Sequence, residues 1–186
     1  IYIKDCKAFW LSKNNVNFFK VNGTRLDGSS DFGNSRLNVV DTIVQNMYTR
    51  SGGVAFFVNA FKTRFEGVVF QGAKTCVQLG EYAQVVEFSG SYCESIYDNC
   101  ENFIKVGEDG YLSVKEISNL SITGVYVNLH NTNNSYGNTD TKFLVAAENV
   151  KLLNLNLSNI RTINSIKYPL LNLNNISGQT YYLSEV

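Results

Sequence analysis

The chain is poor in the residues that most often build chemical centres. Among its 186 residues there is one histidine, His130, and there are four cysteines. The cysteine spacing fits no zinc pattern, so we expect no metal site and no cofactor. The sequence contains no glycine-rich phosphate loop, no EF-hand loop and no G-x-S-x-G motif. A triad of the Ser-His-Asp type stays open as an alternative, although no nucleophile motif supports it.

Charge imbalance and long apolar runs are also missing. The 16 basic and 16 acidic residues give a formal net charge of zero, and no basic patch stands out. Nucleic acid is therefore not an expected partner. No apolar run reaches the length that spans a bilayer, so no membrane partner is expected either. Helix-like periodicity is scarce, which favours a chain built from strands.

A recurring six-residue string has two apolar columns, two residues apart. Its copies are FFKVNG (18–23), AFFVNA (55–60), CVQLGE (76–81), FIKVGE (103–108), FLVAAE (143–148) and LLNLNN (170–175). The first column holds Phe19, Phe56, Val77, Ile104, Leu144 and Leu171. The second column holds Val21, Val58, Leu79, Val106, Ala146 and Leu173. A period of two, with mostly polar residues between the columns, predicts a strand with one buried face.

A second string follows the first and carries a glycine or an asparagine at its third position. Its copies are VQNMYT (44–49), FEGVVF (65–70), FSGSYC (88–93), ITGVYV (122–127) and LSNIRT (157–162). Glycine and asparagine tolerate positive φ, so corners are predicted at Asn46, Gly67, Gly90, Gly124 and Asn159. The high asparagine content, 24 residues, suits both corners and stacked ladders.

Strand-and-corner units that recur about 20 to 40 residues apart are typical of a solenoid, because a short strand cannot bury its apolar side alone. We therefore predict an all-β fold, a single-stranded right-handed parallel β-helix. One domain of about seven coils should cover residues 1–186, with loops inserted near 24–36, 95–102, 130–141 and 162–169. Because the chain starts at Ile1 within a strand-like pattern, we interpret it as a fragment of a longer chain.

With this register, the coils FIKVGEDG (103–110) and ISNLSITGVYV (117–127) resemble the solenoids of bacteriophage tailspikes and pre-neck appendage proteins, within the pectate-lyase-like β-helix superfamily. The resemblance is architectural and implies a parallel homotrimer on the virion, beside other tail proteins. It also implies assembly in the host cytoplasm and action outside the host cell. The implied ligand is a host surface glycan such as capsule, O-antigen or teichoic acid.

A stripe of outward residues in the second string is the first candidate site. Two residues after each corner come Tyr48, Val69, Tyr92, Tyr126 and Arg161. Tyrosine rings stack on sugar faces and their hydroxyls bond to sugar hydroxyls, so Tyr48, Tyr92, Tyr126 and Arg161 are predicted to bind carbohydrate. The alternative is that the stripe packs beneath a loop or against a neighbouring chain.

Glycoside hydrolysis needs two carboxylates, and Glu94 and Asp98 are the candidate catalytic pair. The alternatives are solvated surface acids, or a second acid supplied by a neighbouring chain. Glu87 falls in the same column as Arg64 and is expected to form a surface ion pair with it. The triplet 138–140, Asn-Thr-Asp, resembles one of four polygalacturonase motifs, but the other three are missing, so we reject that activity.

Two further groups of residues carry expectations of their own. Cys76 and Cys93 stand where other copies carry apolar residues, so buried free thiols are predicted, with a Cys93–Cys100 disulfide as an alternative. Phe57 and Val145 fall in the outward column of the first string, where apolar side chains would suit contact with a second chain or cover by a loop.

The first hypothesis is a phage tail spike or appendage segment that binds a host polysaccharide, with or without cleaving it. Two alternatives stay open. One is a fragment of a bacterial polysaccharide lyase or glycoside hydrolase, and the other is a non-enzymatic structural β-helix of an adhesin or fibre. The sequence does not distinguish hydrolase from lyase chemistry and does not name the glycan.

Overall fold

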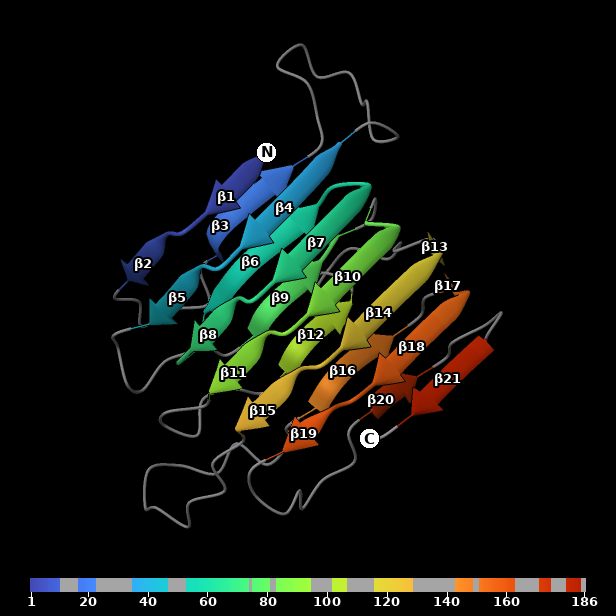
Figure 1. Cartoon of the computed structure of the whole chain (residues 1–186). Coiled ribbons are helices and arrows are strands. Elements are labelled where there is room, and N and C mark those ends of the chain that lie inside the picture. Colours follow the sequence, from blue (N-terminus) through green and yellow to red (C-terminus); the bar gives the residue numbers. More distant parts are fainter. Residues whose placement is uncertain are drawn as a thin grey trace.

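A computed structural model describes residues 1–10, 17–22, 35–46, 53–73, 75–80, 83–94, 102–106, 116–128, 143–148, 151–162, 171–174 and 180–184. Throughout these ranges the regular elements are β-strands, and no helix occurs among them (Figure 1). Of the predicted loops at 24–36, 95–102, 130–141 and 162–169, all but a few terminal residues lie outside the described residues. Arg36, Asn102 and Thr162, at the ends of these predicted loops, belong to strands. Within the described ranges, no helix is long and apolar enough to cross a membrane.

The strands form three main parallel sheets. The first sheet contains β1 (Tyr2–Lys4), β4 (Arg36–Val40), β7 (Lys62–Glu66), β10 (Val85–Ser89), β14 (Asn119–Thr123), β18 (Asn154–Ser158) and β21 (Thr180–Ser184). The second contains β2 (Lys7–Trp10), β5 (Ile43–Asn46), β8 (Val69–Gln71), β11 (Tyr92–Glu94), β15 (Tyr126–Asn128) and β19 (Arg161–Thr162). The third contains β3 (Asn17–Asn22), β6 (Val54–Asn59), β9 (Thr75–Leu79), β12 (Asn102–Val106), β16 (Phe143–Glu148) and β20 (Leu171–Asn174). A small fourth sheet pairs β13 (Glu116–Ile117) with β17 (Lys151–Leu152).

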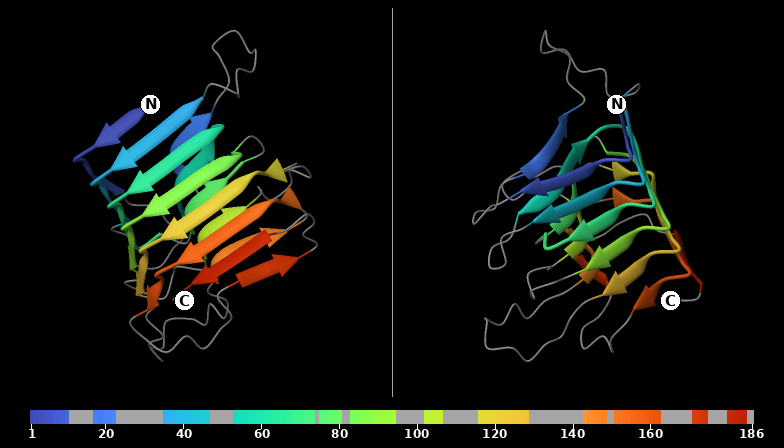
Figure 2. Two further views of the ribbon diagram at one scale, coloured as in Figure 1. Left: turned by 45° about the vertical axis from the view of Figure 1, so that its right-hand side comes forward. Right: turned by 60° about the vertical axis from the view of Figure 1, so that its left-hand side comes forward.

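The chain visits the three main sheets in turn, and we call one such passage a circuit. Each strand lies parallel to the strand of the same sheet in the circuit before, so β10 pairs with β7 and with β14. Figure 2 shows the strands side by side in sequence order, with the two termini at opposite ends of the stack. The predicted all-β chain with parallel sheets is confirmed, and the strand order is compatible with a parallel β-helix.

Residues that pair in register in successive circuits form a row along the stack, and we call such a row a file. The files whose side chains point inward make up the core. In the first sheet, strands such as β10 and β14 alternate between buried and partly exposed residues, as a half-buried strand does. Aromatic rings in the inward files stack directly: Phe19 on Phe56 at 4.6 Å, and Phe65 on Phe88 at 4.8 Å between centroids. Such pairs contribute about 0.5–1.5 kcal/mol beyond the area they bury.

The register of the third sheet agrees with the predicted columns in five of six circuits. Phe19, Phe56, Val77 and Ile104 pair in sequence, and Leu171 ends the file. In β16 the prediction was wrong by one residue, because Val145 pairs with Ile104 and with Leu171. Ala147 correspondingly takes the place predicted for Ala146.

The one-residue error in β16 has a physical cause. The residue directly before the inward column is also buried, and these preceding residues make a second buried file. This file is formed by Ala55, Cys76, Phe103 and Leu144, which are all buried in the core cluster. Two consecutive buried residues depart from the regular alternation of a strand. Because both neighbours in β16 are apolar, Leu144 and Val145 are equally good candidates by sequence pattern alone.

The prediction that Phe57 and Val145 both lie in the outward column was wrong for Val145, and neither side chain is exposed. Val145 is fully buried because it belongs to the inward file. Phe57 does pair with Lys20 and Gln78 in the outward file, but it is buried too. The ammonium of Lys20 lies 5.3 Å from the centre of the Phe57 ring. Neither residue therefore offers an exposed apolar surface to a second chain.

The corners between the first and second sheets each hold one residue with positive φ. These residues are Asp5 (53°), Asp41 (46°), Gly67 (61°), Gly90 (57°), Gly124 (61°) and Asn159 (51°). Glycine lacks a Cβ, and aspartate and asparagine visit this region more readily than other side chains do, which explains the residue types. The corners predicted at Gly67, Gly90, Gly124 and Asn159 agree with the structure.

The corner predicted at Asn46 was wrong. Asn46 is the last residue of β5, and the corner of that circuit is Asp41, because Ile43 pairs with Val69. The string aligned with FEGVVF is therefore VVDTIV (39–44). A search that accepted aspartate beside glycine and asparagine would have found this corner.

Hydrogen bonds continue through every corner. The corner N–H donates to a carbonyl of the next circuit, as from Asp41 to Glu66 at 2.9 Å and from Gly90 to Thr123 at 3.1 Å. The residue two positions later donates to the circuit before, as from Tyr92 to Val68 at 2.9 Å. The chain therefore changes direction without leaving these amides unpaired.

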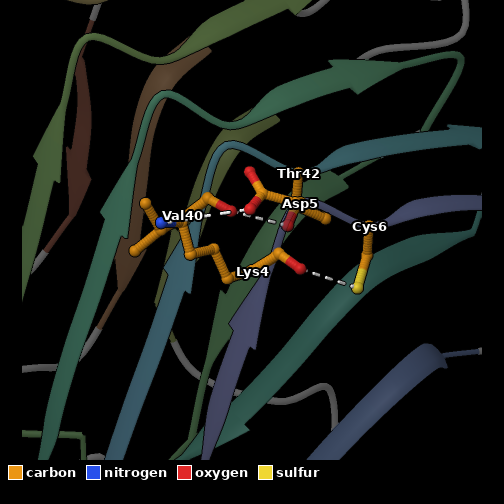
Figure 3. Close-up of polar contacts among 5 residues, drawn as sticks. All are labelled: Lys4, Asp5, Cys6, Val40 and Thr42. Carbon is orange, nitrogen blue, oxygen red and sulfur yellow. Dashed lines mark hydrogen bonds and ion pairs between the residues drawn. The ribbon is translucent and has the colours of Figure 1, made fainter.

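The residue after the corner is buried in every circuit except the first, where Cys6 is exposed. Polar side chains at this position bond back to the carbonyl before the corner. Figure 3 shows two examples, with Thr42 Oγ1 donating to the Val40 carbonyl at 2.9 Å and Cys6 Sγ donating to the Lys4 carbonyl at 3.2 Å. The Asp5 amide also donates to the Val40 carbonyl, at 3.2 Å. Thr42 is fully buried, and this bond satisfies its hydroxyl.

Candidate functional site

The candidate site is an outward file on the second sheet. Register places six residues in this file, in the order Lys7, Ile43, Val69, Tyr92, Tyr126 and Arg161. Tyr92, Tyr126 and Arg161 are therefore direct neighbours in three successive circuits, as the sequence predicted. We call these three residues the tyrosine–arginine stripe.

Tyr48 does not belong to this file, because the corner of its circuit is Asp41 and the file position is Ile43. Tyr48 itself lies outside the described residues. The aromatic part of the file is thus a pair of adjacent tyrosines, with the aliphatic residues Val69 and Ile43 before it.

The two tyrosine rings lie one over the other. Their centroids are 5.7 Å apart and their planes differ by 22°. Tyr126 is 39% exposed and Tyr92 is half-buried, so both remain accessible from the same side of the sheet. A stacked pair with one side open is a flat apolar platform with hydroxyl groups, which is the chemistry that a sugar ring fits.

The backbone beneath the stripe is held from both directions. The N–H groups of Tyr126 and Arg161 donate to the carbonyls of Ser91 and Val125, each at 3.0 Å. The next residues inward, Cys93 and Val127, are buried in the core. The stripe therefore stands on a fixed strand surface, which lowers the entropy cost of binding a ligand.

Arg161 supplies a positive charge at the end of the stripe. It is exposed and pairs in register with Tyr126. No ion pair of Arg161 occurs among the described residues. A guanidinium beside an aromatic platform suits a ligand that carries carboxylate or phosphate groups.

A second outward file runs beside the stripe, two positions along the same strands. Its members in register are Phe9, Gln45, Gln71, Glu94 and Asn128. Gln45 and Gln71 stand on the strands of Ile43 and Val69, in the two circuits before the tyrosine pair. Phe9 is exposed at the end of the stack.

The proposed catalytic pair is only partly described. Glu94 ends β11 and pairs with Gln71 and Asn128, which puts it on the strand that carries Tyr92. Asp98 lies outside the described residues, so the pair Glu94 and Asp98 stays a prediction. His130 and the triplet 138–140 lie outside them as well.

The ion pair expected between Glu87 and Arg64 was wrong, although the two residues are neighbours in register. Arg64 pairs with Glu66 of its own strand at 3.0 Å, and Glu87 lies 3.8 Å from Lys62. All four side chains are well exposed, so each pair contributes little to stability. These acids form a solvated charged surface on the first sheet.

Among the remaining described residues, the two kinds of chemical centre to consider are a metal site and a pair of thiols. Within the described ranges, no group of three or more histidine, cysteine, aspartate or glutamate residues could hold a metal ion. Cys76 and Cys93 are buried and neither is in a disulfide, as predicted, and their sulfur atoms lie 3.2 Å apart. The sequence reasoning did not foresee this contact, because the two residues belong to different strings.

Comparison with known proteins adds no identification. No protein-family model, no curated protein and no solved structure matches this chain. The tyrosine–arginine stripe and the parallel sheets that carry it are therefore the basis for a functional conclusion.

Proposed function

We propose that this chain is a β-helical segment of a phage-type tail spike or appendage, and that it binds a host surface polysaccharide on the tyrosine–arginine stripe. The proposed architecture is a single-stranded right-handed parallel β-helix, because the chain visits three parallel sheets in turn. Each circuit adds one outward position about 4.8 Å from the last, which makes a long repetitive face. Repetitive faces of this kind fit linear polymers better than small ligands.

The single observation that carries the proposal is the stacked pair of Tyr92 and Tyr126 beside Arg161. Adjacent exposed apolar side chains that form a contiguous patch often mark a ligand-binding site. The Arg161 guanidinium and the tyrosine hydroxyls are groups that can hydrogen-bond to acidic and hydroxyl groups of a sugar. The ligand class proposed is a capsule, an O-antigen or a teichoic acid.

The remaining parts of the proposal concern the assembly. The segment works in a homotrimer on the virion, next to other tail proteins, and it acts outside the host cell. Glu94 stands on the strand of Tyr92 and is proposed to act with Asp98 in cleavage of the bound glycan. Binding and cleavage are separate statements and need separate tests.

The experiment is a binding titration of the purified chain with capsule, O-antigen and teichoic acid preparations. Tyr92→Ala with Tyr126→Ala should abolish binding, whereas Tyr182→Ala should not. Tyr182 is a suitable control because it is an exposed tyrosine on the outward side of the first sheet, paired with Asn156. Equal binding by all variants, with unchanged circular dichroism, would exclude the stripe as the site. Light scattering of the same samples tests the trimer.

Cleavage is tested on any glycan that binds. Release of reducing ends indicates hydrolysis, and release of unsaturated uronates indicates a lyase. Glu94→Gln with Asp98→Asn should stop release and leave binding intact. A chain that binds without releasing either product is a receptor-binding segment only.

A further inference from the structure

Cys76 and Cys93 form a buried dithiol between neighbouring circuits. Their Sγ atoms lie 3.2 Å apart, both side chains are buried, and neither sulfur is in a disulfide. Cys76 belongs to β9 in the third sheet and Cys93 to β11 in the second sheet. The contact therefore joins two sheets and two circuits.

The file to which each cysteine belongs explains where its sulfur atom lies. Cys76 stands in the additional buried file of the third sheet, where its neighbours are Ala55 and Phe103. Cys93 stands in the inward file of the second sheet, between Phe70 and Val127. Both side chains are thus directed into the same core, and the sheet framework holds them together.

We propose that Cys76 and Cys93 are an oxidative modification site that closes to an intramolecular disulfide. The sulfur atoms of a disulfide lie about 2.0 Å apart, so they need to approach by about 1 Å. The oxidant is a small peroxide such as hydrogen peroxide, because a bulky disulfide reagent cannot easily reach a buried thiol.

The chemistry balances in two steps. One thiolate attacks the peroxide, the O–O bond breaks, and a sulfenic acid and water form. The second thiolate then attacks the sulfenic sulfur, the S–O bond breaks, and the S–S bond forms with release of a second water. Two thiols and one peroxide give one disulfide and two waters.

The bridge has a structural consequence for the stripe. The loop from Cys76 to Cys93 contains all of β10, and Cys93 directly follows Tyr92 on β11. Closing this loop restricts the unfolded chain and ties the strand of Tyr92 to the circuit before it. The oxidised protein should therefore resist unfolding better than the reduced protein.

The test uses the full chain with Cys6→Ser and Cys100→Ser, so that Cys76 and Cys93 are the remaining thiols. After hydrogen peroxide treatment, the protein is denatured, alkylated and cleaved after glutamate. We expect peptides 67–81 and 88–94 joined by one disulfide, with a mass two hydrogens below the sum of the separate peptides. Two alkylated cysteines, a sulfinic acid at either position, or a disulfide-linked dimer would overturn the proposal.

A second readout is thermal unfolding. The midpoint should rise by several degrees on oxidation and return with dithiothreitol. Cys76→Ala and Cys93→Val are the matched variants, because Ala55 and Val127 occupy the same files in neighbouring circuits. These variants should show no shift with peroxide. A rise of equal size in either variant would assign the effect to another group.

Discussion

Asp41 and Gly67 occupy the same corner in consecutive circuits, and a Cβ atom built on Gly67 would lie 2.5 Å from Asp41 Oδ1. Gly90 occupies the corner of the circuit after, and a Cβ there would meet no atom within 4 Å. Both glycines have positive φ, at 61° and 57°. The two glycines therefore share one backbone conformation but differ in the space that is available for a Cβ atom.

Gly67→Ala should lower the free energy of unfolding more than Gly90→Ala does. Each alanine costs about 1–2 kcal/mol for the left-handed conformation. At Gly67 the exposed Asp41 side chain must also move aside, which adds a smaller cost. Urea titration of both variants measures the difference, and equal losses would show that the carboxylate moves aside freely.

Thr63→Val should stabilise the protein by about 1 kcal/mol. The Thr63 hydroxyl is fully buried in an inward file, between Leu37 and Val86, and it has no hydrogen-bond partner among the described residues. Valine keeps the shape and removes an unsatisfied polar group, which costs about 1–3 kcal/mol when buried.

Thr42→Val is the matched control for that experiment. Thr42 is equally buried, but its hydroxyl donates to the Val40 carbonyl at 2.9 Å. Losing this bond should destabilise the protein by about 0.5–1.5 kcal/mol. Opposite signs for the two variants in thermal or urea unfolding are the expected result. A loss of stability in Thr63→Val would mean that its hydroxyl has a partner.

Val69→Tyr should strengthen glycan binding, provided that the proposed function is correct. Val69 precedes Tyr92 in the same outward file, so a tyrosine there extends the platform by one ring. One additional stacked ring should contribute about 1 kcal/mol, which is roughly a fivefold gain in affinity. Val85→Tyr on the first sheet is the control and should leave the affinity unchanged. A gain from Val85→Tyr of the same size would indicate nonspecific adhesion.

Arg161→Gln should reduce the salt dependence of binding to an acidic glycan. The exposed guanidinium contributes a screened attraction, which weakens as the ionic strength rises. Affinity measured at low and high salt should converge for the variant and diverge for the native chain. Arg64→Gln, on the first sheet, should not alter this slope. An unchanged slope in Arg161→Gln would show that the stripe does not meet an acidic group.

Much of the fold was predictable because the first sheet alternates between buried and partly exposed residues, and because the two apolar columns of the third sheet are in register in five of six circuits. The file from Phe19 to Ile104 and the corners at Gly67, Gly90 and Gly124 follow from residue type alone. These are positions where burial or positive φ permits few alternatives. The adjacency of Tyr92 and Tyr126 follows directly from those corners.

The errors occurred where two residues satisfied the same physical requirement. Leu144 and Val145 are both buried, so hydrophobicity could not decide the register of β16. The corner was assigned to Asn46 because asparagine was accepted there and Asp41 was not considered. The ion pairs were not predicted, because the partner of an exposed charge depends on the length and conformation of the side chain and not on strand register.

The forward and backward hydrogen bonds at each corner connect a circuit only to its two neighbours. Loss of order in one circuit therefore removes support from the adjacent circuit and not from distant ones, so opening should spread inward from the terminal strands. Hydrogen exchange should then be slowest at the amides of β9 and β12 and fastest at those of β1 and β21, giving a protection profile graded along the stack in place of a single global transition.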